Sequence, residues 1–128
     1  MNPLMTFLDS IRDHLDLYVL PPVAAVEVTA GTRPVSVQLW ALDLPGIAGG
    51  LLAWAATLDD VTASLWRVKG GSSVHLSVTG RMPSGVPVRV YGGVPFSAEV
   101  FPDLPAGPAQ EMPVFVLRQW TNAEGVAA

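Results

Sequence analysis

The chain begins with hydrophobic residues spaced three or four positions apart, which is the pattern of an amphipathic α-helix. Asn2 suits the N-cap of this helix, and Pro3 suits its first position, where a missing N–H loses no hydrogen bond. Pro21 and Pro22 prevent the helix from continuing. The apolar stripe of the predicted helix consists of Leu4, Leu8, Ile11 and Leu15.

The hydrophobic period then changes to two, which is typical of β-strands that bury one face. Residues 26–29 and 35–40 both alternate in this way, and residues 30–34 between them contain glycine and proline, so we expect a β-hairpin. A second helix is predicted from about Pro45 to Leu58, because proline suits a first helical turn and apolar residues return to helical spacing. Its stripe repeats the spacing of the first helix and consists of Ile47, Leu51, Trp54 and Leu58.

Three further strands are predicted at residues 61–68, 73–81 and 86–91. The loops that join them are short and contain glycine, and such loops connect antiparallel neighbours. The three strands should therefore form a β-meander. One of its faces carries valine and leucine and the other carries mostly polar and aromatic residues, so we expect the valine face to pack beneath the helices.

Regular alternation ends after residue 91. Residues 92–113 contain five prolines and three glycines, which favours an irregular segment that wraps the domain. Residues 113–120 allow two interpretations, because a proline at the start favours a short helix whereas the following Val-Phe-Val favours a strand. We prefer the helix.

Together these elements predict an α+β domain in the order α-β-β-α-β-β-β. Its sheet would have five strands, mainly antiparallel, with two helices packed on one face. Residues 1–91 would form the core of this single domain, and residues 92–128 would form its proline- and glycine-rich wrapping segment.

The composition raises the question of a membrane, because half of the 128 residues are hydrophobic and only 14% are charged. The longest stretch without a charge is Leu44–Leu58, which is shorter than the roughly 20 residues that a spanning helix needs and contains proline and glycine. We therefore expect a soluble domain that does not enter a membrane. The chain has no cysteine and no basic residue before Arg12, so a cytoplasmic location is expected.

The net charge of −4 is unevenly distributed along the chain. Residues 1–60 carry a net charge of −5 and residues 92–128 carry −3, whereas residues 61–91 carry +4. This basic meander is the feature that favours nucleic acid, although so few basic residues do not require phosphate binding. The four basic residues are Arg67, Lys69, Arg81 and Arg89.

Side chains that would carry catalysis are scarce. His14 and His75 are the two histidines, and neither has neighbours at metal-ligand spacing. Residues 70–73 suit a hairpin turn, since no helix follows them as in a phosphate-binding loop. The pair Asp59-Asp60 suits a polar turn. We therefore predict no catalytic residue, metal or cofactor, and an enzyme with a site assembled from loops is an alternative without support.

The outer face of the predicted sheet is the candidate binding surface. Tryptophan, tyrosine and arginine are enriched at protein interfaces, which favours binding of a protein partner or of a second copy. Aromatic residues on a sheet also stack single-stranded bases, so a single-stranded nucleic-acid module is the alternative. A third possibility is that the proline-rich segment covers the tryptophans as a second small core. The candidate residues are Gln38, Trp40, Trp66, His75, Arg89 and Tyr91.

Three runs in the sequence carry a resemblance: residues 52–62 (LAWAATLDDVT), 74–81 (VHLSVTGR) and 88–95 (VRVYGGVP). They resemble small uncharacterised proteins of actinomycete phages and integrative mobile elements. The resemblance implies an accessory role in a mobile element and no catalytic residues. The end of the chain, Ala127-Ala128, resembles the apolar ends that bacterial AAA+ proteases read on tagged substrates, although a frayed alanine-rich end is the preferred interpretation.

Overall fold

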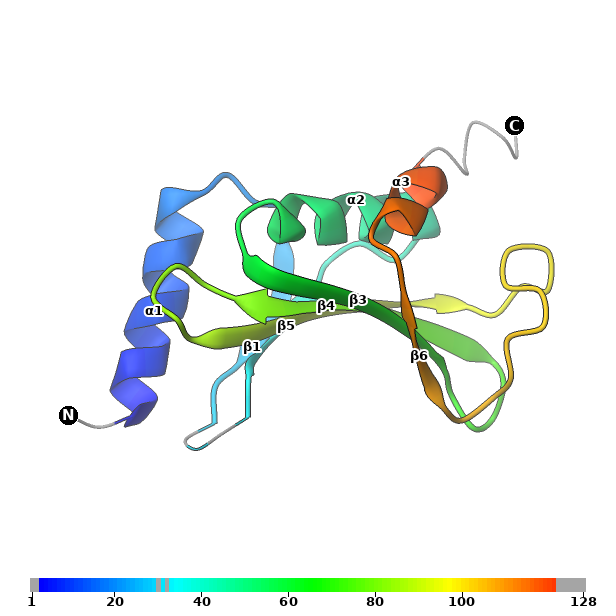
Figure 1. Cartoon of the computed structure of the whole chain (residues 1–128), viewed down its shortest axis with the longest axis horizontal. Coiled ribbons are helices and arrows are strands. Elements are labelled where there is room, and N and C mark those ends of the chain that lie inside the picture. Colours follow the sequence, from blue (N-terminus) through cyan, green and yellow to red (C-terminus); the bar gives the residue numbers. More distant parts are fainter. Residues whose placement is uncertain (1–2, 30, 32, 122–128) are drawn as a thin grey trace.

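The computed structural model describes residues 3–29, 31 and 33–121, which form an α+β fold (Figure 1). Two helices lie together above one face of a curved sheet, and a third lies beside the end of that sheet. Asn2 and the Ala127-Ala128 end lie outside the described residues. The described elements are α1 (Pro3–Leu17), β1 (Val23–Glu27), β2 (Val35–Leu39), α2 (Leu44–Ala55), β3 (Asp59–Arg67), β4 (Ser73–Arg81), β5 (Pro87–Pro95), β6 (Ala109–Met112) and α3 (Phe115–Thr121).

The strands form one mixed sheet in the order β1-β2-β5-β4-β3-β6. The predicted hairpin and meander are both present as antiparallel pairs, β1 with β2 and β3 with β4 with β5. They meet where β5 runs parallel to β2. The first seven elements follow the expected order. In the described residues the sheet has six strands, one more than expected, and α3 follows the two helices that were expected to pack on one face.

The additional strand, β6, lies in the segment that the sequence predicts to be irregular. It pairs antiparallel with the edge of β3, with Met112 opposite Ala63 and Ala109 opposite Trp66. Its sequence, Ala-Gln-Glu-Met, has no alternation of apolar residues, and most of it is exposed. A short edge strand of this kind is held by backbone pairing, so the hydrophobic pattern gives no sign of it.

Helix α2 packs at the centre of the core. Asp43 forms its N-cap and accepts a hydrogen bond of 2.8 Å from the backbone N–H of Gly46. Ile47, Leu51 and Trp54 are fully buried against the valine face of the sheet. Gly92 of β5 permits this close approach, because a Cβ there would lie about 3.0 Å from the side chain of Ile47.

The segment after β5 contributes to the same core. Phe101, Leu104 and Leu117 are all buried, and the ring of Phe101 meets the ring of Trp120 edge-on at 5.4 Å between centroids. The core therefore extends well beyond residue 91. Short helix α3 packs against α2, in agreement with the helical interpretation of residues 113–120.

Helix α1 departs from the expected packing. The sequence predicts that its leucine stripe is buried, but Leu8 and Leu15 are 40% and 37% exposed. Ile11 of the stripe is buried as expected, and the other buried residues of the helix are Ser10 and His14. Among the described residues, no helix is long and apolar enough to cross a membrane.

Candidate functional site

The strand register places five of the six candidate residues on the face of the sheet opposite α2. Gln38 of β2 lies beside Tyr91 of β5, and His75 of β4 lies beside Trp66 of β3. Arg89 is two residues from Tyr91 on the same strand and therefore points to the same side. We call Gln38, Trp66, His75, Arg89 and Tyr91 the aromatic sheet face.

The rings of this face form a row across three strands. The centroids of Trp66 and His75 are 5.3 Å apart, and those of His75 and Tyr91 are 6.3 Å apart. The guanidinium carbon of Arg89 lies 5.1 Å from the centroid of Tyr91, within range of a cation–π interaction. All four side chains are partly exposed. The result is an ordered row of rings with a positive charge at one end.

The surroundings of the row are polar and small. The hydroxyl oxygens of Ser64 and Ser77 are hydrogen bonded at 2.8 Å beside it. Gly93 lies opposite His75, and a Cβ there would be 3.8 Å from the imidazole ring, so the glycine leaves one side of that ring open. The aromatic row is thus accessible from solvent.

Trp40 is separate from the aromatic sheet face. Strand β2 ends at Leu39, and the backbone N–H of Trp40 donates to the carbonyl of Pro22 at 3.1 Å. The indole is 68% exposed and lines a hollow of about 130 Å³ together with Gly46 and Gly50 of α2. The sequence prediction extended the alternation of the strand one residue beyond its end.

The proline-rich segment packs on the helix side of the sheet. Residues 100–104 line a hollow of about 240 Å³ with Leu65 of β3, Met112 of β6 and Trp120 of α3. Met112 lies opposite the buried Ala63, on the helix side of the sheet. Figure 1 shows α2 and α3 on this same side. Within the described residues, the segment therefore leaves the aromatic sheet face uncovered.

Arg67 does not contribute its charge to the aromatic sheet face. It follows Trp66 on β3 and so points to the opposite side. Its guanidinium group donates to the backbone carbonyls of Gly71 and Leu104, both at 3.0 Å, and its carbon lies 3.5 Å from the ring centroid of Phe96. One of the four basic residues of the meander is thus engaged in holding the proline-rich segment.

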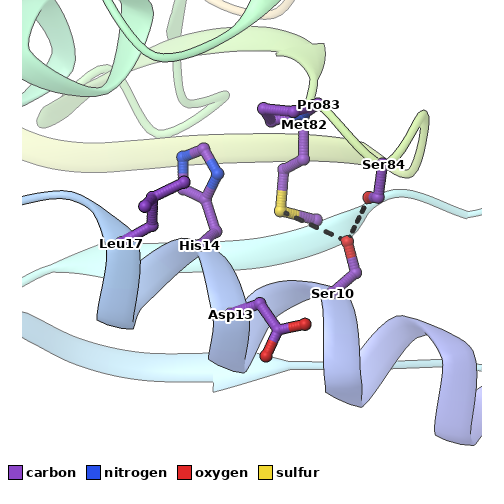
Figure 2. Close-up of a pocket in the computed structure, with 7 residues that line it drawn as sticks. All are labelled: Ser10, Asp13, His14, Leu17, Met82, Pro83 and Ser84. Atoms are coloured by element: carbon purple, nitrogen blue, oxygen red, sulfur yellow. Dashed lines mark hydrogen bonds between the residues drawn. The ribbon is translucent and has the colours of Figure 1, made fainter.

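A small pocket of about 100 Å³ between α1 and the turn after β4 contains serine, aspartate and histidine (Figure 2). The Ser10 hydroxyl is hydrogen bonded to the Ser84 hydroxyl, and Asp13 points away from the other side chains. His14 points away from Ser10, so the nucleophile–base contact of a hydrolytic triad is not formed. This pocket has the composition of a triad without its geometry.

His14 serves as a buried anchor for α1. Its Nε2 lies 2.8 Å from the Thr57 hydroxyl, which itself donates to the carbonyl of Trp54 at 2.7 Å, so Nε2 is the donor in the first contact. The imidazole stacks on Trp54 with 5.3 Å between centroids and meets Tyr18 at 4.7 Å. Burial lowers the pKa of His14 below its ordinary value of 6.5.

A second candidate surface lies between α1 and β1, and sequence reasoning did not identify it. It is an apolar groove of about 540 Å³. Its lining includes the leucine stripe of α1, which the sequence assigns to the core. The same hydrophobic spacing is expected for a buried helix face and for one that lines a groove, so the sequence alone does not distinguish them. The lining residues are Leu4, Leu8, Ile11, Arg12, Leu15, Asp16, Val26 and Val28.

Across the described part of the chain, no three histidine, aspartate or glutamate residues cluster to hold a metal ion. Comparison with protein-family models, curated proteins and solved structures found no match.

Proposed function

We propose that this chain is a small non-enzymatic binding protein that uses the aromatic sheet face to hold a protein partner or a second copy of itself. The row formed by Trp66, His75 and Tyr91, with Arg89 at its end, is the observation that carries the proposal. Tyrosine, tryptophan and arginine provide large contact areas at protein interfaces and lose little conformational freedom on binding. The row is already ordered by its own ring contacts, so binding would immobilise few side chains.

Electrostatics favour a protein over a single-stranded nucleic acid. The guanidinium group of Arg67 is engaged on the other side of the sheet, which leaves Arg89 and Arg81 as the cations on this face. Glu27 and Glu111 flank the same face, opposite Ser36 and Ser64 in the register. Nucleic-acid affinity depends on the number of phosphates that cations neutralise, so this balance supports only weak binding.

We also propose, from the resemblance of its sequence, that the protein has an accessory role in an actinomycete phage or integrative element and acts in the cytoplasm. In this setting the partner would be another protein of the element or of its host. The proposal concerns only the partner's origin and does not depend on the geometry of the aromatic sheet face.

The test compares a double variant, Trp66→Ser with Tyr91→Ser, with wild-type protein. Light scattering over a concentration series measures self-association, and quantitative affinity capture from an actinomycete host measures partner binding. The double variant should lose either the self-association or the captured partner while unfolding at a similar temperature, because both side chains are partly exposed. Thr79→Ala on β4 is the matched control, since it changes an exposed residue of the same face outside the aromatic row.

Two results would overturn the proposal. One is unchanged association in a double variant that remains folded. The other is saturable, salt-sensitive binding of an oligothymidine probe that is lost in the same variant, which would assign the face to nucleic acid.

A further inference from the structure

Helix α1 presents two faces of opposite character. On one side, Ser10 and His14 hold the helix to the rest of the fold through Ser84 and Thr57. On the other side, its leucines line the groove beside β1 and remain substantially exposed. On this apolar side Ile11 is buried, whereas Leu8 and Leu15 are left without protein over much of their surface.

The floor of the groove is the edge of the sheet. β1 is the terminal strand in the order of the sheet, and β2 is its neighbour. An edge strand has one row of backbone N–H and C=O groups directed away from the sheet, where they can pair with another strand. Val26 of this strand is 40% exposed and lines the groove, although its partner Val37 is completely buried.

These features have the geometry that strand addition needs. A segment paired with the free edge of β1 would continue the sheet beneath the overhanging leucine side of α1. Its side chains would point alternately toward the two faces of the sheet. Every second side chain would thus meet Leu8 and Leu15, which requires apolar residues there, and the others would face solvent.

The charges around the groove indicate which residues would occupy the other, solvent-facing positions of the bound segment. Asp9, Asp13 and Asp16 lie on α1, and Glu27 lies on β1. Arg12 forms ion pairs with Asp9 and Asp13, at 3.3 and 3.2 Å. In the described residues, Asp16 and Glu27 form no ion pair, and both are exposed. Asp16 lines the groove, whereas Glu27 lies opposite Ser36 on the other face of β1, toward which the solvent-facing side chains of an added strand would point.

The same charges disfavour a second copy of this chain as the occupant. The segment from α1 to β2 contains four carboxylates but only two guanidinium groups, those of Arg12 and Arg33. Pairing β1 with β1 of another copy would bring two acidic surfaces together, and juxtaposed like charges oppose association. A basic segment would meet the opposite sign.

We propose that the groove between α1 and β1 binds an extended segment of another protein, in which apolar residues alternate with lysine or arginine, as an added strand on β1. This mode of recognition combines backbone pairing with pockets for alternate side chains. The groove lies on the helix side of the sheet, so this site is distinct from the aromatic sheet face and goes beyond the function proposed above.

The probe is a synthetic peptide of about ten residues in which valine and lysine alternate. Calorimetry measures its affinity, and amide hydrogen exchange locates the contact. Saturable binding is expected, with new protection of β1 amides and with about tenfold weaker affinity in Leu8→Ser and in Glu27→Lys. Both substituted residues are exposed, so the variants should remain folded, and their thermal unfolding checks this. The double variant of the aromatic sheet face should bind the peptide unchanged.

Three comparison peptides make the test specific. Replacing lysine by glutamate should abolish binding through charge, and N-methylating alternate backbone amides should abolish it by removing the strand's donors. A peptide of the same composition with helical spacing should bind more weakly. Binding without protection of β1 would overturn the proposal, as would equal affinity for the glutamate or N-methylated peptide. Dimerisation of the free chain that is lost in Leu8→Ser would assign the groove to a second copy and would also overturn it.

Discussion

Helices α1 and α2 carry the same hydrophobic spacing but pack in opposite ways. The stripe of α2 starts at Ile47 and is buried over its whole length, whereas Leu8 and Leu15 in the stripe of α1 are substantially exposed. Helix α2 packs closely because Gly92 presents no side chain to it. Helix α1 is instead held by hydrogen bonds from Ser10 and His14. Identical spacing can thus mark either a core helix or a helix that keeps its apolar side available.

The largest effect should come from truncating the buried stripe. Leu51→Ala should destabilise the fold by about 2–5 kcal/mol, because the side chain is fully buried and its removal leaves a cavity. Leu8→Ala should cost less than about 1 kcal/mol, because that leucine is already exposed. Urea denaturation measures both. Equal losses of unfolding free energy in the two variants would mean that α1 buries its stripe in solution, and the contrast between α1 and α2 would be wrong.

The close packing of α2 on the sheet is tested by two adjacent glycines. Gly92→Val should cost about 1–3 kcal/mol, because its Cβ would lie about 3.0 Å from Ile47 beneath the helix. Gly93→Val should be within about 0.5 kcal/mol of wild type, since its Cβ would meet the nearest His75 atom at an ordinary 3.8 Å. Thermal unfolding of the pair provides the measurement. A tolerated Gly92→Val would show that α2 is not closely packed on β5.

The polar anchor of α1 should make stability depend on pH. Burial lowers the pKa of His14, so below about pH 6.5 the unfolded chain binds more protons than the folded chain. Stability should therefore be complete above pH 6.5 and should fall as the pH decreases from that value toward the lower pKa of the folded state. The unfolding temperature of wild type should decrease more than that of His14→Gln between about pH 7.5 and pH 5.5. If the unfolding temperatures of wild type and His14→Gln changed in parallel with pH, His14 would not be the buried anchor of α1.

The sequence predicts the elements better than it predicts their exposure. Alternation along β2, β3, β4 and β5 places Gln38, Trp66, His75 and Tyr91 on one face, because the period of two leaves no choice once the valine face is buried. It fails at Trp40, where the strand has already ended. Strand β6 is missed because backbone pairing, not apolar alternation, holds it.

The α1–β1 groove is missed for a different reason. Spacing identifies which residues share one side of a helix, but not whether another element covers that side. Whether the side is covered depends on distant residues: the turn at Met82–Ser84 and Thr57, just after the end of α2, contact the polar side of α1. These tertiary contacts fix the rotation of α1 about its axis, and the spacing of hydrophobic residues within α1 does not predict them.

The absence of cysteine from the sequence allows a direct test of the two helices. Single variants Leu8→Cys and Leu51→Cys each introduce one thiol, and the rate of its reaction with a thiol reagent reports exposure in the folded protein. Leu8→Cys should react rapidly and should be protected by the valine–lysine peptide, whereas Leu51→Cys should react only on unfolding. Equal protection of the two thiols without peptide would contradict the account, because the stripe of α1 would then be closed like that of α2.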